Sequence, residues 1–288
     1  MIKTIYAIAF LVAILGLAYH FAALKIFNVF VAKDTGSQQI SGLVQYGLDP
    51  AQSLFVFRPN GVATSLPVLI FVHGGSWEED NAADYGFIGR AFAAQGYLTL
   101  VINYRARPHH TYPAFIEDVA QGVAWANQHA QQYGGNGDQI YLVGHSAGAY
   151  NVAQAVLDQH YFINAGANPG SVKAVATLAG PFDFLPLDSP ITQATFGDVA
   201  DLSSTQPINF AHRNAPPFLI LHGSADATVY PKNAVSLSLH LQQAGAHPKL
   251  VEYKDISHTG ILLALAKPLR GYAPVLEDVL TFFKDNSK

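Results

Sequence analysis

The chain has 288 residues, which is enough for one large domain with a substantial core or for two small domains. Half of the residues are hydrophobic, only 12% are charged and the formal net charge is −4, so a nucleic-acid-binding surface is not expected. Cysteine is absent, which excludes disulfides, thiolate metal sites and a cysteine nucleophile.

The N-terminal segment has the composition of a membrane-targeting signal. Thr4–Leu24 contains no Asp, Glu, Lys or Arg, and about 20 apolar residues suffice to cross a bilayer as a helix. Its front part, Ile5–Leu15, also matches the hydrophobic region of a cleavable signal peptide, with Gly16-Leu17-Ala18 as the cleavage site. We favour an uncleaved anchor, because the apolar character continues as far as Phe27.

Both interpretations divide the chain in the same way. Residues 1–33 would be the export segment with a linker, and residues 34–288 would be one catalytic domain on the non-cytoplasmic side. An uncleaved segment would make the membrane a partner of the protein, whereas cleavage would leave a secreted or periplasmic domain. The sequence does not determine the oligomeric state.

After residue 33, predicted strands alternate with predicted helices. Continuous apolar or β-prone runs predict strands at residues 54–59, 67–72, 97–103, 139–143, 172–178, 218–221 and 249–253. Helices are predicted between them at residues 85–95, 113–132, 149–157, 232–244 and 274–284. This alternation predicts an α/β domain with a mostly parallel, doubly wound sheet and helices on both faces. Sites in such sheets form beyond the carboxyl ends of the strands.

The first motif at a strand end is Gly144–Gly148, which reads Gly-His-Ser-Ala-Gly and lies between a predicted strand and a predicted helix. In a G-x-S-x-G turn of this kind, the serine occupies a strained position that exposes its hydroxyl. The helix that follows begins with free backbone N–H groups, which can face a developing oxyanion. We therefore predict that Ser146 is a nucleophile.

Two further strand ends supply the partners of a serine nucleophile. Asp226 follows the predicted strand at residues 218–221, and His258 follows the strand at residues 249–253. The order Ser146, Asp226, His258 is the chain order of a Ser-His-Asp triad on a parallel α/β sheet. Asp183 and Asp255 are rival acids, since the first follows an earlier strand and the second lies three residues before His258.

Other chemistries find little support in the sequence. The phosphate-binding patterns G-x-x-x-x-G-K-[ST] and G-x-G-x-x-G and the zinc-binding pattern H-E-x-x-H are absent. The adjacent pair His109-His110 would point in different directions on an extended loop, so we interpret both as surface residues. We expect no metal and no organic cofactor.

The motifs resemble those of a known superfamily. His73–Trp77, which reads His-Gly-Gly-Ser-Trp, and the later Gly-His-Ser-Ala-Gly are similar to the esterase/lipase branch of the α/β-hydrolases. That branch includes hormone-sensitive-lipase-like esterases and kynurenine formamidases. Asn103-Tyr104-Arg105, Pro113 and Asp118 resemble the Y-R…P…D stretch of the same branch. The similarity extends from about Gly47 to the C-terminus.

The resemblance implies an α/β-hydrolase fold and an oxyanion hole formed by the backbone N–H groups of Gly75, Ser76 and Ala147. Ser76 departs from the pattern, because many relatives carry a third glycine at this position. The implied activity is hydrolysis of carboxylic esters with short to medium acyl chains through an acyl-enzyme. An arylformamidase or other amidase would use the same residues, and a non-catalytic membrane-tethered binding domain is a further alternative.

The region that would select the substrate is a long insertion at about residues 181–211. Its apolar side chains could form the roof of an acyl pocket, or they could pack a lid helix onto the core. The sequence supports both interpretations equally. The side chains concerned include Phe182, Phe184, Leu185 and Phe196.

Overall fold

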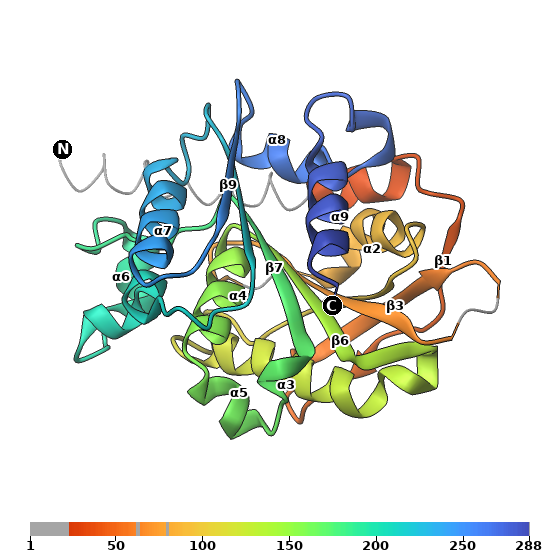
Figure 1. Cartoon of the computed structure of the whole chain (residues 1–288), viewed down its shortest axis with the longest axis horizontal. Helices are drawn as coiled ribbons and strands as arrows, with labels where there is room; N and C mark the ends of the chain where they lie inside the picture. Colours follow the sequence, from red (N-terminus) through yellow and green to blue (C-terminus); the bar gives the residue numbers. More distant parts are fainter. Residues whose placement is uncertain (1–22, 62–63, 79–80, 288) are drawn as a thin grey trace, which may run out of the picture.

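The computed structural model describes residues 23–61, 64–78 and 81–287. In these residues the strands are β1 (Ser37–Gln39), β2 (Val44–Gln45), β3 (Ser53–Pro59), β4 (Leu66–Val72), β5 (Leu98–Ile102), β6 (Gly135–His145), β7 (Val172–Leu178), β8 (Phe218–Gly223) and β9 (Lys249–Tyr253). They form one sheet in the order β1-β3-β5-β4-β6-β7-β8-β9, with β2 paired to β3 (Figure 1). All neighbouring pairs from β5 to β9 are parallel, and β3 joins β5 in the antiparallel sense.

The helices of the same residues lie between or after the strands. They are α2 (Gly86–Ala93), α3 (Ala114–His129), α4 (Ala147–Leu157), α5 (His160–Ala165), α6 (Pro190–Phe196), α7 (Lys232–Gln243), α8 (His258–Leu263) and α9 (Val275–Asp285). Residues 23–30 are also helical. Short 3₁₀ helices occur at Ala82–Tyr85, Ala130–Tyr133, Pro169–Ser171, Leu202–Thr205, Pro207–Phe210 and Lys267–Leu269.

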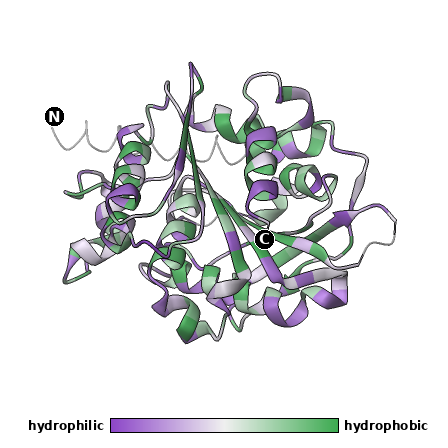
Figure 2. Ribbon diagram, viewed as in Figure 1, coloured by the Kyte–Doolittle hydropathy of each residue, from purple (hydrophilic) through white to green (hydrophobic). Residues whose placement is uncertain are grey.

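The core consists of two layers, one on each face of the sheet. Successive side chains of a strand point to opposite faces, so Ile70 of β4 packs in the layer that contains α3, α4 and α7. Its neighbour Phe71 packs in the layer that contains α2 and α9. Figure 1 shows these two groups of helices on opposite sides of the sheet, and Figure 2 shows the hydrophobic colouring of the strands between them. Because both faces are covered, β4 has a continuous apolar sequence rather than an alternating one.

The predicted α/β class and mostly parallel sheet are confirmed, with differences at several boundaries. β6 begins at Gly135, four residues before the predicted start. The predicted helix at residues 113–132 is α3 up to His129 and continues as a 3₁₀ helix to Tyr133. The sequence reading missed β1, β2, α5, α6 and α8, none of which exceeds seven residues. Elements this short carry too few residues to show a hydrophobic period.

The predicted anchor Thr4–Leu24 lies, apart from its last two residues, outside the described residues. Among the helices of the described residues, none has the length and hydropathy to cross a bilayer. The helix of residues 23–30 packs against the core through Leu24 and Phe27, and the Phe27 ring lies 5.4 Å from that of Phe87 in α2. The side chain of Asn28 fixes this packing, since it donates to Ala83 O and accepts from Phe87 N.

A buried ion pair joins the loop after β5 to α3. The Arg105 side chain contacts both carboxylate oxygens of Asp118, with Nη2 2.7 Å from Oδ1. The Asp118 side chain is 0% exposed, and Gln52, the residue before β3, donates a further hydrogen bond to it. Burial raises the pKa of the Asp118 carboxyl, and the hydrogen bonds from Arg105 partly offset that rise. This pair fixes the loop whose Tyr104 hydroxyl lies 3.0 Å from the Gly74 carbonyl oxygen.

We predict that Arg105→Met reduces the free energy of unfolding by about 3–5 kcal/mol at neutral pH, because it leaves the buried Asp118 charge without its partner. Removing Arg105 also raises the Asp118 pKa further, so protonation relieves the unpaired charge as the pH falls. The free energy of unfolding that Arg105→Met loses relative to wild type should therefore be smaller at pH 5 than at pH 8. Urea unfolding at both pH values measures it.

Glu117→Gln is the matched control for this prediction. Glu117 contacts the same Arg105 guanidinium at 3.0 Å, but its side chain is 46% exposed, so the loss should be at most about 1 kcal/mol. Equal losses in the two variants would contradict the buried pair as the source of stability.

Candidate active site

Ser146 occupies a strained turn between β6 and α4. Its φ of 54° and ψ of −123° lie in a region that non-glycine residues rarely adopt. The turn is held in place by a hydrogen bond from Ser146 N to Leu178 O in β7. Gly148 allows α4 to approach β4, because a Cβ atom there would lie 2.2 Å from the Val72 carbonyl oxygen. The strain is therefore supported by close packing against two neighbouring strands.

The structure brings Ser146, His258 and Asp226 into one hydrogen-bonded chain. Ser146 Oγ lies 2.9 Å from His258 Nε2, and His258 Nδ1 lies 2.8 Å from Asp226 Oδ2. Ser146 follows β6, Asp226 follows β8 and His258 begins α8 after β9, so the three residues meet at the carboxyl end of the sheet. Because a carboxylate only accepts hydrogen bonds, the proton of a neutral His258 lies on Nδ1 and Nε2 faces the serine hydroxyl.

The Asp226 carboxylate is surrounded by donors. Its Oδ1 accepts from the backbone N–H groups of Thr228 and Val229, each at 2.9 Å. Its Oδ2 accepts from His258 and lies 3.2 Å from His222 Nε2. Burial alone would raise the pKa of Asp226, but the hydrogen bonds from His222 and His258 outweigh it and hold that pKa below its usual range. Asp226 therefore carries a stable negative charge beside the imidazole.

The two rival aspartates have other partners. Asp183 Oδ2 accepts a 2.6 Å hydrogen bond from Ser236 Oγ in α7. Asp255 is exposed, and its backbone N–H donates to Ser224 Oγ. All three aspartates lie in the described part of the chain, and Asp226 is the one among them whose carboxylate contacts His258.

The loop after β4 lies directly against the nucleophile. A Cβ atom on Gly74 would approach Ser146 Cβ to 3.0 Å, so a side chain here would crowd the nucleophile candidate and glycine favours this approach. Gly75 and Ser76 have φ values of 113° and 58°, which turn the backbone sharply beside Ser146. Among the described residues, no group accepts a hydrogen bond from the backbone N–H of Gly75, Ser76 or Ala147. These three donors are the ones that the resemblance implied for an oxyanion hole.

Three residues that support the site were missed by sequence reasoning. His145 donates through Nε2 to the backbone oxygen of His258 at 3.0 Å. This hydrogen bond holds the start of α8 next to the turn that carries Ser146. Trp77 donates to Asn151 in α4 and so connects the loop after β4 to the helix that follows Ser146. His222 contacts Asp226. His145 and Trp77 lie within the quoted motifs, but their contacts join distant segments and have no signal in the sequence. His222 lies four residues before Asp226, and no pattern in the sequence marks that its ring turns toward the carboxylate.

The insertion after β7 is packed onto the core through aromatic side chains and buried hydrogen bonds. Phe182 and Phe196 are fully buried, and the Phe196 ring lies 4.9 Å from that of Trp77. The Tyr150 hydroxyl of α4 donates to the Thr205 carbonyl oxygen at 2.8 Å. Phe184 is half-buried and Leu185 is 38% exposed. Phe182 and Phe196 thus pack the insertion onto the core, and Phe184 and Leu185 remain candidates for contact with an acyl group.

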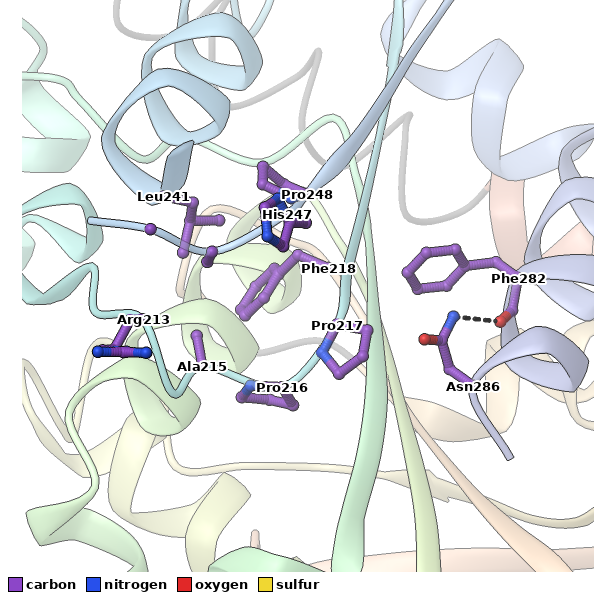
Figure 3. Close-up of a pocket in the computed structure, with 12 residues that line it drawn as sticks. Arg213, Ala215, Pro216, Pro217, Phe218, Leu241, His247, Pro248, Phe282 and Asn286 are labelled. Atoms are coloured by element: carbon purple, nitrogen blue, oxygen red, sulfur yellow. Dashed lines mark hydrogen bonds between the residues drawn. The ribbon is translucent and has the colours of Figure 1, made fainter. Parts of the chain in front are cut away.

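A cavity of about 320 Å³ lies at the opposite end of β8 from Asp226, and Figure 3 shows residues that line it. Phe218, the first residue of β8, contributes to its wall together with Pro217, His247 and Phe282. The cavity is not lined by Ser146, His258 or Asp226. The described residues also contain no cluster of His, Asp or Glu side chains that could hold a metal ion.

The parallel sheet, the strained serine at the turn into α4 and the order of the three site residues define an α/β-hydrolase. The model of the BD-FAE family matches residues 54–241, and the chain belongs to this family. The predicted resemblance to the esterase/lipase branch of the α/β-hydrolases is confirmed.

Curated relatives carry esterase names. Esterase LipC of Mycobacterium tuberculosis is 37% identical over 213 residues, which are 67% of this chain and 53% of LipC. A probable isoprenylcysteine α-carbonyl methylesterase of Oryza sativa is 28% identical over 267 residues, which are 85% of this chain and 64% of that protein. The chain thus spans between about half and two thirds of the length of these relatives.

Solved structures share the fold at low sequence identity. Esterase B of Lactobacillus rhamnosis superposes with a TM-score of 0.84 at 18% identity, covering 100% of this chain and 97% of that chain. A truncated carbohydrate esterase from gut microbiota gives a TM-score of 0.73 at 22% identity, covering 89% of this chain and 99% of that chain. At these identities the similarity establishes the fold alone.

Proposed function

We propose that this protein is a serine hydrolase that cleaves carboxylic esters of small molecules, with Ser146 as nucleophile, His258 as general base and Asp226 as the acid that orients it. The observation that carries the proposal is the continuous hydrogen-bonded chain from Ser146 Oγ to His258 Nε2 at 2.9 Å and from His258 Nδ1 to Asp226 Oδ2 at 2.8 Å. The esterase names of its relatives support the same class of reaction.

The reaction begins when Ser146 Oγ attacks the acyl carbonyl carbon of the ester. His258 Nε2 takes the hydroxyl proton as the O–C bond forms, and the carbonyl oxygen becomes an oxyanion. The backbone N–H groups of Gly75, Ser76 and Ala147 then donate to this oxyanion. One such donor typically contributes about 2.7–4 kcal/mol to transition-state stabilisation.

The tetrahedral intermediate collapses when His258 returns its proton to the leaving alkoxide oxygen, which releases the alcohol and leaves an acyl-Ser146 ester. Water then attacks the acyl carbon while His258 again accepts a proton, and the carboxylic acid departs with Ser146 restored. Asp226 remains ionised in both steps. Its charge stabilises the imidazolium that forms twice in each cycle.

The acyl chain is proposed to be short to medium in length. Phe184 and Leu185 are among the partly exposed apolar side chains of the insertion, so they are available to contact such a chain. An arylformamidase or other amidase is the second candidate, because the same nucleophile and donors act on a formamide. A non-catalytic binding domain would keep the fold but would not need the hydrogen-bonded chain of Ser146, His258 and Asp226.

We predict that Ser146→Ala abolishes hydrolysis of p-nitrophenyl butyrate, with kcat lowered at least about 10⁴-fold, because no other group can form the acyl-enzyme. Ser287→Ala, at an exposed serine near the C-terminus, should leave the rate unchanged. Wild type should also react with a fluorophosphonate at Ser146. Retention of a tenth of the activity in Ser146→Ala would exclude this mechanism, and faster turnover of N-formylkynurenine than of the ester would favour a formamidase.

The identity of the acid gives a separate prediction. Asp226→Asn should lower kcat by up to about 10⁴-fold, because an amide cannot hold the His258 tautomer that exposes Nε2 to the serine. Asp183→Asn and Asp255→Asn are matched controls and should stay within about threefold of wild type. Steady-state kinetics of the three variants decides the assignment. If Asp183→Asn lowered kcat by orders of magnitude while Asp226→Asn kept the wild-type kcat, Asp183 rather than Asp226 would be the acid.

We also propose that the protein is exported, with its catalytic domain anchored by Thr4–Leu24 on the non-cytoplasmic side of a membrane. The charge-free composition of this stretch supports an anchor or a cleaved signal. The helix of residues 23–30 adds to the argument, since Ile26, Val29 and Phe30 are 59%, 64% and 82% exposed. These positions share one face of the helix, and a lipid surface would cover them.

We predict that a C-terminal alkaline phosphatase fusion is active, because the phosphatase folds only after export, and that the full-length chain stays in the membrane fraction after a carbonate wash. Leu11→Arg with Leu15→Arg should abolish both properties, since each charge costs about 2.5–3.5 kcal/mol at the centre of an inserted helix. The paired substitution Lys25→Ala with Lys33→Ala serves as the control outside the stretch. Recovery of full-length wild type in the soluble cytoplasm would contradict export.

A further inference from the structure

His222 is a buried histidine that the mechanism above does not use. It is the fifth residue of β8, and it is 1% exposed. Its Nε2 lies 3.2 Å from Asp226 Oδ2 and 2.8 Å from the Val229 carbonyl oxygen. A buried polar side chain that reaches the candidate acid from a strand of the sheet calls for a physical reason.

The contacts determine which ring nitrogen of His222 carries hydrogen. A carboxylate and a carbonyl oxygen both accept hydrogen bonds, so Nε2 must be the donor: it bonds the Val229 carbonyl oxygen at 2.8 Å and has Asp226 Oδ2 as a second acceptor at 3.2 Å. Nδ1 is buried, and no described residue accepts or donates a hydrogen bond there. A hydrogen on Nδ1 would therefore lack an acceptor, and the contacts select the tautomer whose single N–H faces Asp226.

His222 differs from the other donors to the carboxylate. The N–H groups of Thr228 and Val229 belong to the loop that carries Asp226, and they hold Oδ1. His258 holds Oδ2 but exchanges a proton with the serine in each cycle. Among the described residues, His222 is the one donor to Asp226 that comes from a strand of the sheet. A donor on a rigid element positions its partner better than a donor on a loop.

We propose that His222 is a positioning residue of the triad, which fixes Asp226 Oδ2 toward His258 Nδ1 by donating from β8 through Nε2–H. The inference rests on the proposed function, because it gives His222 a role in the same reaction. The same Nε2–H group also contacts the Val229 carbonyl oxygen, so it links the Asp226 side chain to the backbone of the loop that follows it. His222 thus holds the carboxylate and the loop in one geometry while His258 gains and loses its proton.

The proposal predicts a specific kinetic effect for donor-free variants. His222→Leu and His222→Phe remove the N–H, so kcat should fall about 10- to 100-fold, the size expected when a hydrogen bond to a charged group is lost. KM should stay within about threefold, because His222 does not touch the substrate. His222→Gln carries an N–H at a similar reach and should recover most of the lost rate.

A double-mutant cycle separates positioning from a general structural role. If His222 acts through the Asp226 charge, His222→Leu should cost less than about threefold in an Asp226→Asn background. Thermal unfolding of each variant measures the effect on the fold. Ser224→Ala is the matched control in the same loop, because its hydroxyl contacts Asp255 rather than Asp226, and it should keep the wild-type kcat.

Several results would overturn the proposal. They are a wild-type kcat in both donor-free variants, an equal loss in the Asp226→Asn background, and a His222→Gln variant as slow as His222→Leu. If neither donor-free variant folds, His222 maintains the fold rather than the triad. A wild-type protein that hydrolyses no ester and is not labelled by a fluorophosphonate would instead overturn the proposed function, so the two failures are distinguishable.

Discussion

The strained backbone at Ser146 is the constraint on which the rest of the site depends. A residue with φ of 54° and ψ of −123° persists only where its surroundings hold it. Here β4 and β7 flank β6 on either side, and Gly148 lets α4 press against the Val72 carbonyl oxygen. The parallel sheet is therefore more than a scaffold, because its central strands keep the serine in a conformation that directs its hydroxyl at His258 and leaves the N–H groups at the start of α4 free.

The charged groups of the domain are few, and the structure partners the buried ones. The Asp226 carboxylate accepts from Thr228, Val229 and His258 and contacts His222, so its negative charge is stable away from water. The Asp118 carboxylate has the Arg105 guanidinium as its partner. The Asp226 contacts lie at the candidate active site, and the Asp118–Arg105 pair fixes the loop that supports the turn after β4 beside Ser146. Both show that a buried charge is stable only where donors replace water.

The supporting contacts connect segments that are far apart in the chain. His145 holds the backbone of His258 across 113 residues, and Trp77 bonds Asn151 across 74 residues. Through these contacts one hydrogen-bonded unit forms at the carboxyl end of the sheet. It consists of the loop after β4, the turn that carries Ser146, and α8. In the proposed mechanism, such a unit would keep His258 and the N–H groups of the oxyanion hole in fixed positions while the substrate changes, which is the requirement for electrostatic preorganisation.

The sequence by itself predicted the fold class, most strands, and Ser146 and His258 together with three candidate aspartates, of which Asp226 has the expected place in the chain order. Long apolar runs and strand-end motifs are local signals, and a parallel sheet brings strand ends together whatever their spacing in the chain. Only the tertiary structure decided that Asp226 rather than Asp183 faces His258, that Phe196 is buried against Trp77, and that His222 reaches the carboxylate. The first two are contacts between distant segments, and the third joins residues four apart at the end of β8. No local pattern of residues specifies which side chains will meet when the chain folds.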